Sequence, residues 1–201
     1  MKRRKPKLVS ARKKRAGGDT GPRAKGRAAR ELVDTIFSQW QAQRPDIDAS
    51  PVHVYGLIGR IQMQCTAFID EVLEPLGLTR GTFDVLTALR RAGAPYCLSP
   101  KQIAQSLLLS GAGLTSRLNK LEAQNLLARL PEPNDRRTLR VQLTAAGEVV
   151  INEAIPLVFE AQRSRLLPLG QDGQQRLVHE LSRFAEIIDG WPSAATGRPQ
   201  K

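Results

Sequence analysis

One segment, from Leu98 to Thr144, constrains the fold of this chain more than any other. It reads LSPKQIAQSLLLSGAGLTSRLNKLEAQNLLARLPEPNDRRTLRVQLT. A stub of strand is followed by a helix start at Ser99-Pro100, where a capping hydroxyl precedes a first-turn proline. A turn at Ser110-Gly111 then leads into a second amphipathic helix. Helix, turn, helix and a following hairpin are the order of a winged helix-turn-helix, which places one helix in the DNA major groove.

The hairpin after the second helix predicts the wing. Its strands are expected at 126–130 and 139–143, around PEPNDRRT, which is too long for a two-residue turn. At the tip stand Asp135, Arg136 and Arg137. An arginine there can enter the minor groove, where negative potential is focused in narrow A·T tracts. We therefore expect Arg136 and Arg137 to bind DNA.

The second helix has a buried side and an outward side. At about 100° per residue, Leu114, Leu118 and Leu121 cluster on one side, which is expected to be buried. Arg117 lies on the shoulder of that stripe, from which an arginine can reach the DNA backbone or turn toward the body of the protein. The predicted contacts to bases and phosphates from the turn and the outward side are Ser110, Ala112, Thr115, Ser116, Asn119 and Lys120.

The distribution of charge agrees with a DNA-binding function. The formal net charge is +12. Residues 1–30 hold 13 Lys and Arg side chains and one acidic residue, so the excess lies in this tail, and the rest of the chain is balanced. Within that rest, residues 80–140 hold ten basic and four acidic side chains. A positive field over the predicted reading segment is what phosphate binding requires, so double-stranded DNA is the expected partner.

The predicted architecture is mainly α with a small β-hairpin wing. The flanking helices carry apolar stripes that a small reading domain does not need, and a homodimer interface would bury them and match two half-sites on palindromic DNA. The expected parts are a disordered basic tail at 1–28, a domain at 29–191 and a flexible tail at 192–201. Within the domain, we expect the reading part at about 79–144 and the dimerisation parts at about 29–75 and 145–191.

Several classes of protein are excluded by what the chain lacks. The sequence contains no apolar run long enough to cross a membrane, and the basic N-terminus lacks the apolar stretch of a signal peptide. Two cysteines, Cys65 and Cys97, make neither a disulfide framework nor a metal spacing, which favours a reducing cytoplasm. Because there is also no phosphate loop and no Ser/Cys–His motif, we expect no enzyme activity and no cofactor.

These motifs resemble those of the MarR family of winged helix-turn-helix regulators. The resemblance extends from about Ala29 to Trp191 and rests on the helix order, the 98–144 segment and the DRR wing followed by Leu143-Thr144-x-x-Gly147. It implies a homodimer that binds a short palindrome and represses genes. It also implies that a small ligand or oxidation relieves the repression.

The chain further looks like the urate-responsive, PecS-type branch of that family. The branch carries an extra N-terminal helix and four ligand-response residues, whose matching positions here are Trp40, Asp84, Arg117 and Arg129. The chemistry is reasonable, because arginine offers a planar bidentate fork to an anionic ring and Trp offers a stacking face. Asp84 would repel the anion or exchange its arginine partner when the anion arrives.

Other readings stay open at this stage. Trp40 could instead be part of a helical core, and Asp84 could only form a local ion pair or cap. Arg117 could contact a DNA phosphate, and Arg129 could simply be an exposed residue of a strand. A redox-sensing repressor would use Cys97 or Cys65, although Cys65 falls on an apolar stripe typical of an inert thiol. A third possibility is a non-specific DNA binder that depends on the basic tail.

Overall fold

The computed structural model describes the backbone of residues 22–107, 113–132 and 135–190, and the side chains of residues 28–107, 113–131 and 139–190. The chain divides into two compact units, residues 1–64 and 65–201. None of the helices in the described ranges is both long and apolar enough to cross a membrane.

Helix α1 (Pro22–Gln43) begins before Ala29, where the folded domain was expected to start. Its first residues fall inside the segment 1–28 that was expected to be disordered, and its start is Pro22 rather than Ala29. The physical reason is local: proline is favoured in the first turn of a helix, and alanine has the highest helix propensity. The basic character of the segment therefore did not exclude a helix.

In the first unit, α1 packs against the start of α2 (Pro51–Leu73). A Cβ placed on Gly56 would lie 3.2 Å from Val33 Cγ2, so the glycine permits a close approach of the two helices. The rings of Phe37 and His53 lie 4.5 Å apart, and His53 Nε2 is 3.4 Å from Asp34 Oδ1. These contacts lie along the same two helices and hold them side by side.

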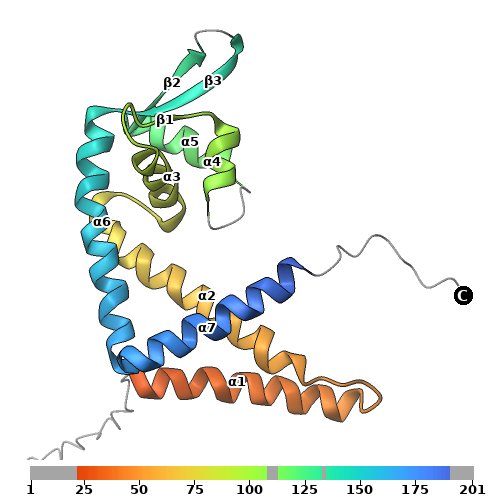
Figure 1. Cartoon of the computed structure of the whole chain (residues 1–201). Helices are drawn as coiled ribbons and strands as arrows, with labels where there is room; N and C mark the ends of the chain where they lie inside the picture. The colour runs from red at the N-terminus through yellow and green to blue at the C-terminus, as the bar shows by residue number, and fades with distance from the viewer. Residues whose placement is uncertain (1–21, 108–112, 133–134, 191–201) are drawn as a thin grey trace, which may run out of the picture. The chain divides into compact units, whose positions relative to one another are not determined.

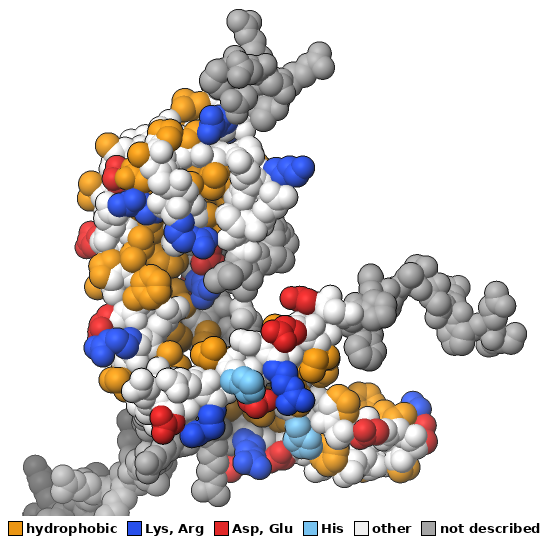
Figure 2. Space-filling model, viewed as in Figure 1, with side chains coloured by type: hydrophobic (Ala, Val, Ile, Leu, Met, Phe, Trp, Pro, Cys, Tyr) orange, Lys and Arg blue, Asp and Glu red, His pale blue; other side chains and the backbone are white. Residues whose placement is uncertain are grey.

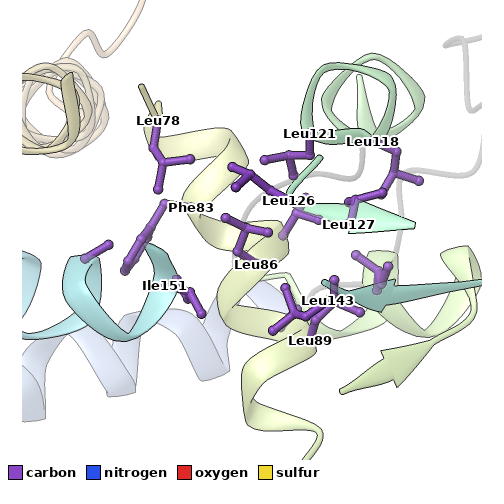
Figure 3. Packing of buried hydrophobic residues seen from close by; sticks show 14 of the residues in the cluster. Leu78, Phe83, Leu86, Leu89, Leu118, Leu121, Leu126, Leu127, Leu143 and Ile151 are labelled. Carbon is purple, nitrogen blue, oxygen red and sulfur yellow. The ribbon is translucent and has the colours of Figure 1, made fainter. Parts of the chain in front are cut away.

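The second unit is built around α3 (Arg80–Arg91). Figure 3 shows Leu86 and Leu89 of α3 among leucines of neighbouring elements, with Ile151 of a later helix close by. The short 3-10 helix η1 (Glu74–Leu76) leads from α2 to Thr79, which caps α3 and accepts a hydrogen bond from the backbone N–H of Thr82. The largest fully buried side chains of the core are Ile69, Leu73, Leu86, Leu89, Ile103, Leu121, Leu127 and Ile151.

The helix-turn-helix consists of α4 (Pro100–Ser106) and α5 (Leu114–Ala123), both packed near α3 (Figure 1). Ser99 caps α4 and accepts a hydrogen bond from Gln102 N, as its place before a proline predicted. Helix α5 begins after Gly113, whose φ of 75° is left-handed and suits glycine. The predicted turn at Ser110-Gly111 lies outside the described residues.

The wing is a three-stranded antiparallel sheet in the order β1-β3-β2. Its strands are β1 (Cys97–Leu98), β2 (Leu127–Glu132) and β3 (Asp135–Leu143). Figure 1 shows β2 and β3 extending together beyond the helices. The predicted strands were too short, because the pairing continues into PEPNDRRT as far as Glu132 opposite Asp135. The register is irregular between Pro131 and Glu132, and Pro131 lies in β2, an edge strand, where proline is tolerated.

The sheet leads into α6 (Ala145–Leu166), and the 3-10 helix η2 (Leu167–Leu169) connects this to α7 (Gly170–Asp189). Thr144 caps α6 and accepts a hydrogen bond from Gly147 N at 2.9 Å. Gly147 packs so closely on the backbone of Leu126 that a Cβ would not fit. In the Leu143-Thr144-x-x-Gly147 motif, the threonine therefore caps α6 and the glycine lets the helix approach the backbone of Leu126 closely. Helix α6 continues without a break through Pro156.

Candidate nucleic-acid interface and anion site

The outward side of α5 is the part of the reading domain that most resembles a DNA-contacting surface. Leu118 and Leu121 are buried and Leu114 is half-buried, which confirms the predicted leucine stripe. The polar residues predicted to contact DNA from this helix are all exposed: Thr115, Ser116, Asn119 and Lys120. Their contact with DNA stays a prediction.

Of the four other residues predicted to bind DNA, the structure describes only the backbone of two, Arg136 and Arg137. Ser110 and Ala112 lie outside the described residues. Arg136 and Arg137 belong to β3 rather than to a loop, directly after the residue where strand pairing starts. Both arginines lie between Asp135, which pairs with Glu132, and Leu139, which pairs with Pro131, so they fall at the register irregularity near the end of the wing.

Arg129 of β2 is bound to α5 by two hydrogen bonds. Its Nη1 donates to Glu122 Oε2 at 2.5 Å, and its Nη2 donates to Asn119 Oδ1 at 2.6 Å. Arg129 also lines a shallow pocket with Pro100 and Thr115. Glu122 was missed by the sequence analysis, although its spacing of three residues from Asn119 places both on the same side of a helix.

Arg117 turns toward the body of the protein, one of the two orientations that its shoulder position allowed. Its guanidinium lies over Gly81 of α3, where an added Cβ would be 2.8 Å from Nε and 3.2 Å from Cζ. Its Nη1 is buried and has no acceptor among the residues that the structure describes. The reading helix therefore carries an unsatisfied cationic donor on the side that faces α3.

Asp84 lies one helical turn after Gly81 and pairs with a different arginine. Arg80 Nε donates to its two carboxylate oxygens at 2.9 and 3.1 Å. Both side chains are largely buried, with exposed fractions of 17% for Arg80 and 14% for Asp84. The sequence analysis did not identify Arg80, although an arginine four residues before an aspartate on a helix is a local signal for this pair.

The predicted ligand residues of the second unit do not form one cluster. Asn119, which binds Arg129, is about 200° around α5 from Arg117. Arg117 is therefore next to the turn of α3 that bears Asp84, whereas Arg129 is next to the predicted DNA surface. Trp40 lies on α1 of the first unit, with an exposed fraction of 46%.

Both cysteines are free and half-buried, Cys65 on α2 and Cys97 on β1. Within the described ranges, no group of three or more His, Cys, Asp or Glu side chains is arranged to hold a metal ion.

The sequence is similar to a family profile and to named transcriptional regulators. The profile of the MarR family matches residues 76–138. The HTH-type transcriptional regulator PecS of Dickeya dadantii is 37% identical over 156 residues, which cover 78% of this chain and 94% of that protein. The multiple antibiotic resistance protein MarR of Escherichia coli is 30% identical over 126 residues, which cover 63% of this chain and 78% of that protein.

Solved structures agree with the sequence relatives. A mutant of Escherichia coli MarR in complex with operator DNA matches with a TM-score of 0.59 and 26% identity, over 72% of this chain and 96% of that one. Bordetella bronchiseptica BpsR, whose DNA binding is regulated by 6-hydroxynicotinic acid, matches with a TM-score of 0.59 and 26% identity, over 66% of this chain and 92% of that one.

The relatives also indicate what kind of protein this is. The relatives that these comparisons name are transcriptional regulators, not enzymes. The identity to PecS, the coverage of almost all of that relative and the winged fold agree with one another. This chain belongs to the MarR family of winged helix-turn-helix, DNA-binding transcriptional regulators.

Proposed function

We propose that this regulator is a homodimeric repressor of a palindromic operator, released by a small planar anion such as urate. One observation carries the proposal. On one side of α5 the polar residues are exposed, while on the side facing α3 the buried Nη1 of Arg117 has no acceptor among the described residues. The same helix thus presents a surface suited to DNA and a donor suited to an anion.

The DNA side of the proposal follows from the chemistry of the exposed residues. Asn119 can bind adenine, Thr115 and Ser116 can bind bases or phosphates, and Lys120 suits phosphate or guanine. Arg136 and Arg137, from the end of the wing, would add minor-groove contacts. These groups are presented by regular elements that the core of the second unit holds in place.

The dimer side of the proposal follows from exposed apolar side chains. On α7, Leu177, Leu181 and Ile188 are exposed at helical spacing. On α6, Val149, Leu157 and Phe159 are exposed as well, and Figure 2 shows apolar side chains on the surface of this part of the molecule. Burying such stripes against a second copy would give two reading helices related by a two-fold axis, as a palindrome requires.

The effector side follows from the unsatisfied donor. A buried N–H without an acceptor costs about 1–3 kcal/mol, and more for a charged group. A planar anion could remove this cost by accepting two parallel hydrogen bonds from the guanidinium. The relative BpsR, which is regulated by 6-hydroxynicotinic acid, shows that a flat aromatic acid acts on a protein of this fold. The role of Trp40 and Arg129 in the site stays a prediction from the resemblance.

A mobility-shift titration on the promoter region of the protein's own gene tests the proposal. We expect urate to release the wild-type protein, and we expect Asp84→Asn and Arg117→Ala to respond poorly. A coupling of about 1–3 kcal/mol between the two sites, or about 5- to 150-fold in DNA affinity, would be enough to regulate binding. If millimolar urate leaves the wild-type complex intact, urate is the wrong effector. If the protein does not select this DNA over a scrambled competitor, repression of its own promoter is wrong.

A further inference from the structure

Two arginines lie near the first turns of α3, on the side that faces the reading helix. Arg80 pairs with Asp84 through Nε, and Arg117 of α5 lies over Gly81. Gly81 is three residues before Asp84, so the two positions are neighbours on the helix surface, with Cβ positions about 5–6 Å apart. Asp84 is therefore within one helical turn of a second cation that has an unused donor.

Arg80 is held by more than this pair. Its backbone N–H donates to Asp70 Oδ1 of α2 at 2.5 Å. Its neighbour Gly81 provides the space that the guanidinium of Arg117 occupies. A single turn of α3 thus connects the end of α2, the carboxylate of Asp84 and the reading helix. The position of the Arg80 side chain is set by the beginning of its own helix.

Electrostatics gives this arrangement a consequence for an anion. A largely buried carboxylate that is not paired would repel an incoming anion, and it would compete for the same donor on Arg117. With Asp84 bound to Arg80, its negative charge is balanced and both of its oxygens accept from Nε. The Nη1 of Arg117 is then the donor that remains for a ligand.

We infer that Arg80 is a positioning residue of the anion site: it holds Asp84 away from Arg117 and so reserves the buried donor of Arg117 for an anionic effector. The inference rests on the proposed function, because it concerns the same site. It adds a residue outside the four that the resemblance to urate-responsive regulators marks. Without Arg80, Asp84 would turn to Arg117 and occupy the place of the anion.

Calorimetric titration of the full-length protein with urate tests the inference. We expect Arg80→Gln to weaken urate binding by about tenfold, which is within the usual range of coupling between sites. Arg80→Lys keeps a cation beside Asp84 and should recover most of the affinity. Arg163→Gln removes the same charge from an exposed pair with Glu160 and should bind urate like the wild type.

A double variant separates positioning from a merely structural role. In Arg80→Gln/Asp84→Asn, the competing carboxylate is gone, so urate affinity should return toward the wild-type value even though Arg80 is absent. A structural defect at position 80 would not be repaired by this second change. Wild-type affinity in Arg80→Gln, or no recovery in the double variant, would overturn the inference. Asp84→Asn itself should bind urate and yet release DNA poorly.

A ligand-free measurement distinguishes failure of this inference from failure of the proposed function. The Nε–Hε resonance of Arg117, assigned with Arg117→Lys, reports the acceptor next to its guanidinium. Arg80→Gln should shift this resonance as Asp84 turns to Arg117, and the added Asp84→Asn should reverse the shift. If wild-type protein binds no urate but the resonance behaves in this way, the effector is wrong and the role of Arg80 stands. An unchanged resonance in Arg80→Gln would refute that role.

Discussion

Arg129 donates a hydrogen bond to Asn119 Oδ1 across 2.6 Å, and this bond joins a predicted ligand residue to a predicted DNA-contacting residue. A second hydrogen bond, to Glu122, keeps Arg129 against the same helix. With its carbonyl oxygen engaged in this way, the amide of Asn119 retains its two N–H donors for a base. The wing and the reading helix are therefore coupled at the surface proposed to contact DNA.

We expect Asn119→Ala to weaken operator binding by about 1–3 kcal/mol and to relax sequence preference at one base pair, because a well-placed side chain on a base edge contributes that much. Fluorescence anisotropy at fixed salt measures the change. Gln124→Ala removes an exposed amide just after the same helix and is the control. Equal losses in both variants would contradict a base contact by Asn119.

The wing has a separate signature. Arg137→Ala should weaken binding and reduce the slope of affinity against salt by about one, because one cationic contact with the DNA is lost. Affinity measured at several salt concentrations checks this. The same substitution at Arg163, which pairs with Glu160 at the exposed surface of α6, should leave the slope unchanged. An unaltered slope in Arg137→Ala would remove this residue from the interface.

Gly81→Ala should abolish the response to the effector without lowering the stability of the protein. The new methyl group would lie 2.8 Å from Arg117 Nε, so the guanidinium must move, while alanine is favoured over glycine in a helix by about 1 kcal/mol. We expect thermal stability to be kept or raised and release by urate to be lost. Gly59→Ala gains the same propensity with no atom within 4 Å of the added Cβ, and it should keep the response.

The dimer prediction is tested on α7. Leu181 is exposed at 51%, and Leu181→Asp would place a charge in the proposed interface, where it could not be paired. We expect light scattering to show a monomer and binding to the palindrome to be lost. Ser182→Asp adds the same charge about 100° around the helix and should remain a dimer. A dimeric Leu181→Asp protein would place the interface elsewhere.

The turn between α1 and α2 has its own pH signature. Hydrogen bonds from Arg44 lower the pKa of Asp46 below its ordinary value, and those from the backbone and side chain of Ser50 lower the pKa of Asp48. Stability from these groups is present above their unfolded pKa and is lost as pH falls through the lower folded pKa. A carboxyl NMR titration should show the pKa of both groups below the ordinary range of an aspartate. Arg44→Gln should return Asp46 alone to its usual range.

The sequence by itself determined the order of elements in the second unit. Thr79, Ser99 and Thr144 mark helix starts by short-range hydrogen bonds, and all three act as caps in the structure. The leucine stripe of α5 likewise follows from helical periodicity. Such signals depend on residues within one turn of each other, so they can be read without knowledge of the fold. The same reading placed the start of α1 too late, because net charge was taken as a sign of disorder.

Only the tertiary structure decided where the charged side chains point. From its phase alone, Arg117 could face DNA or the body of the protein, and the choice depends on Gly81, which is distant in sequence and leaves room for the guanidinium. The hydrogen bond from Arg129 to Asn119 likewise depends on how β2 packs against α5. Long, flexible side chains take the partners that packing brings within reach, and packing is set by elements far apart in the chain.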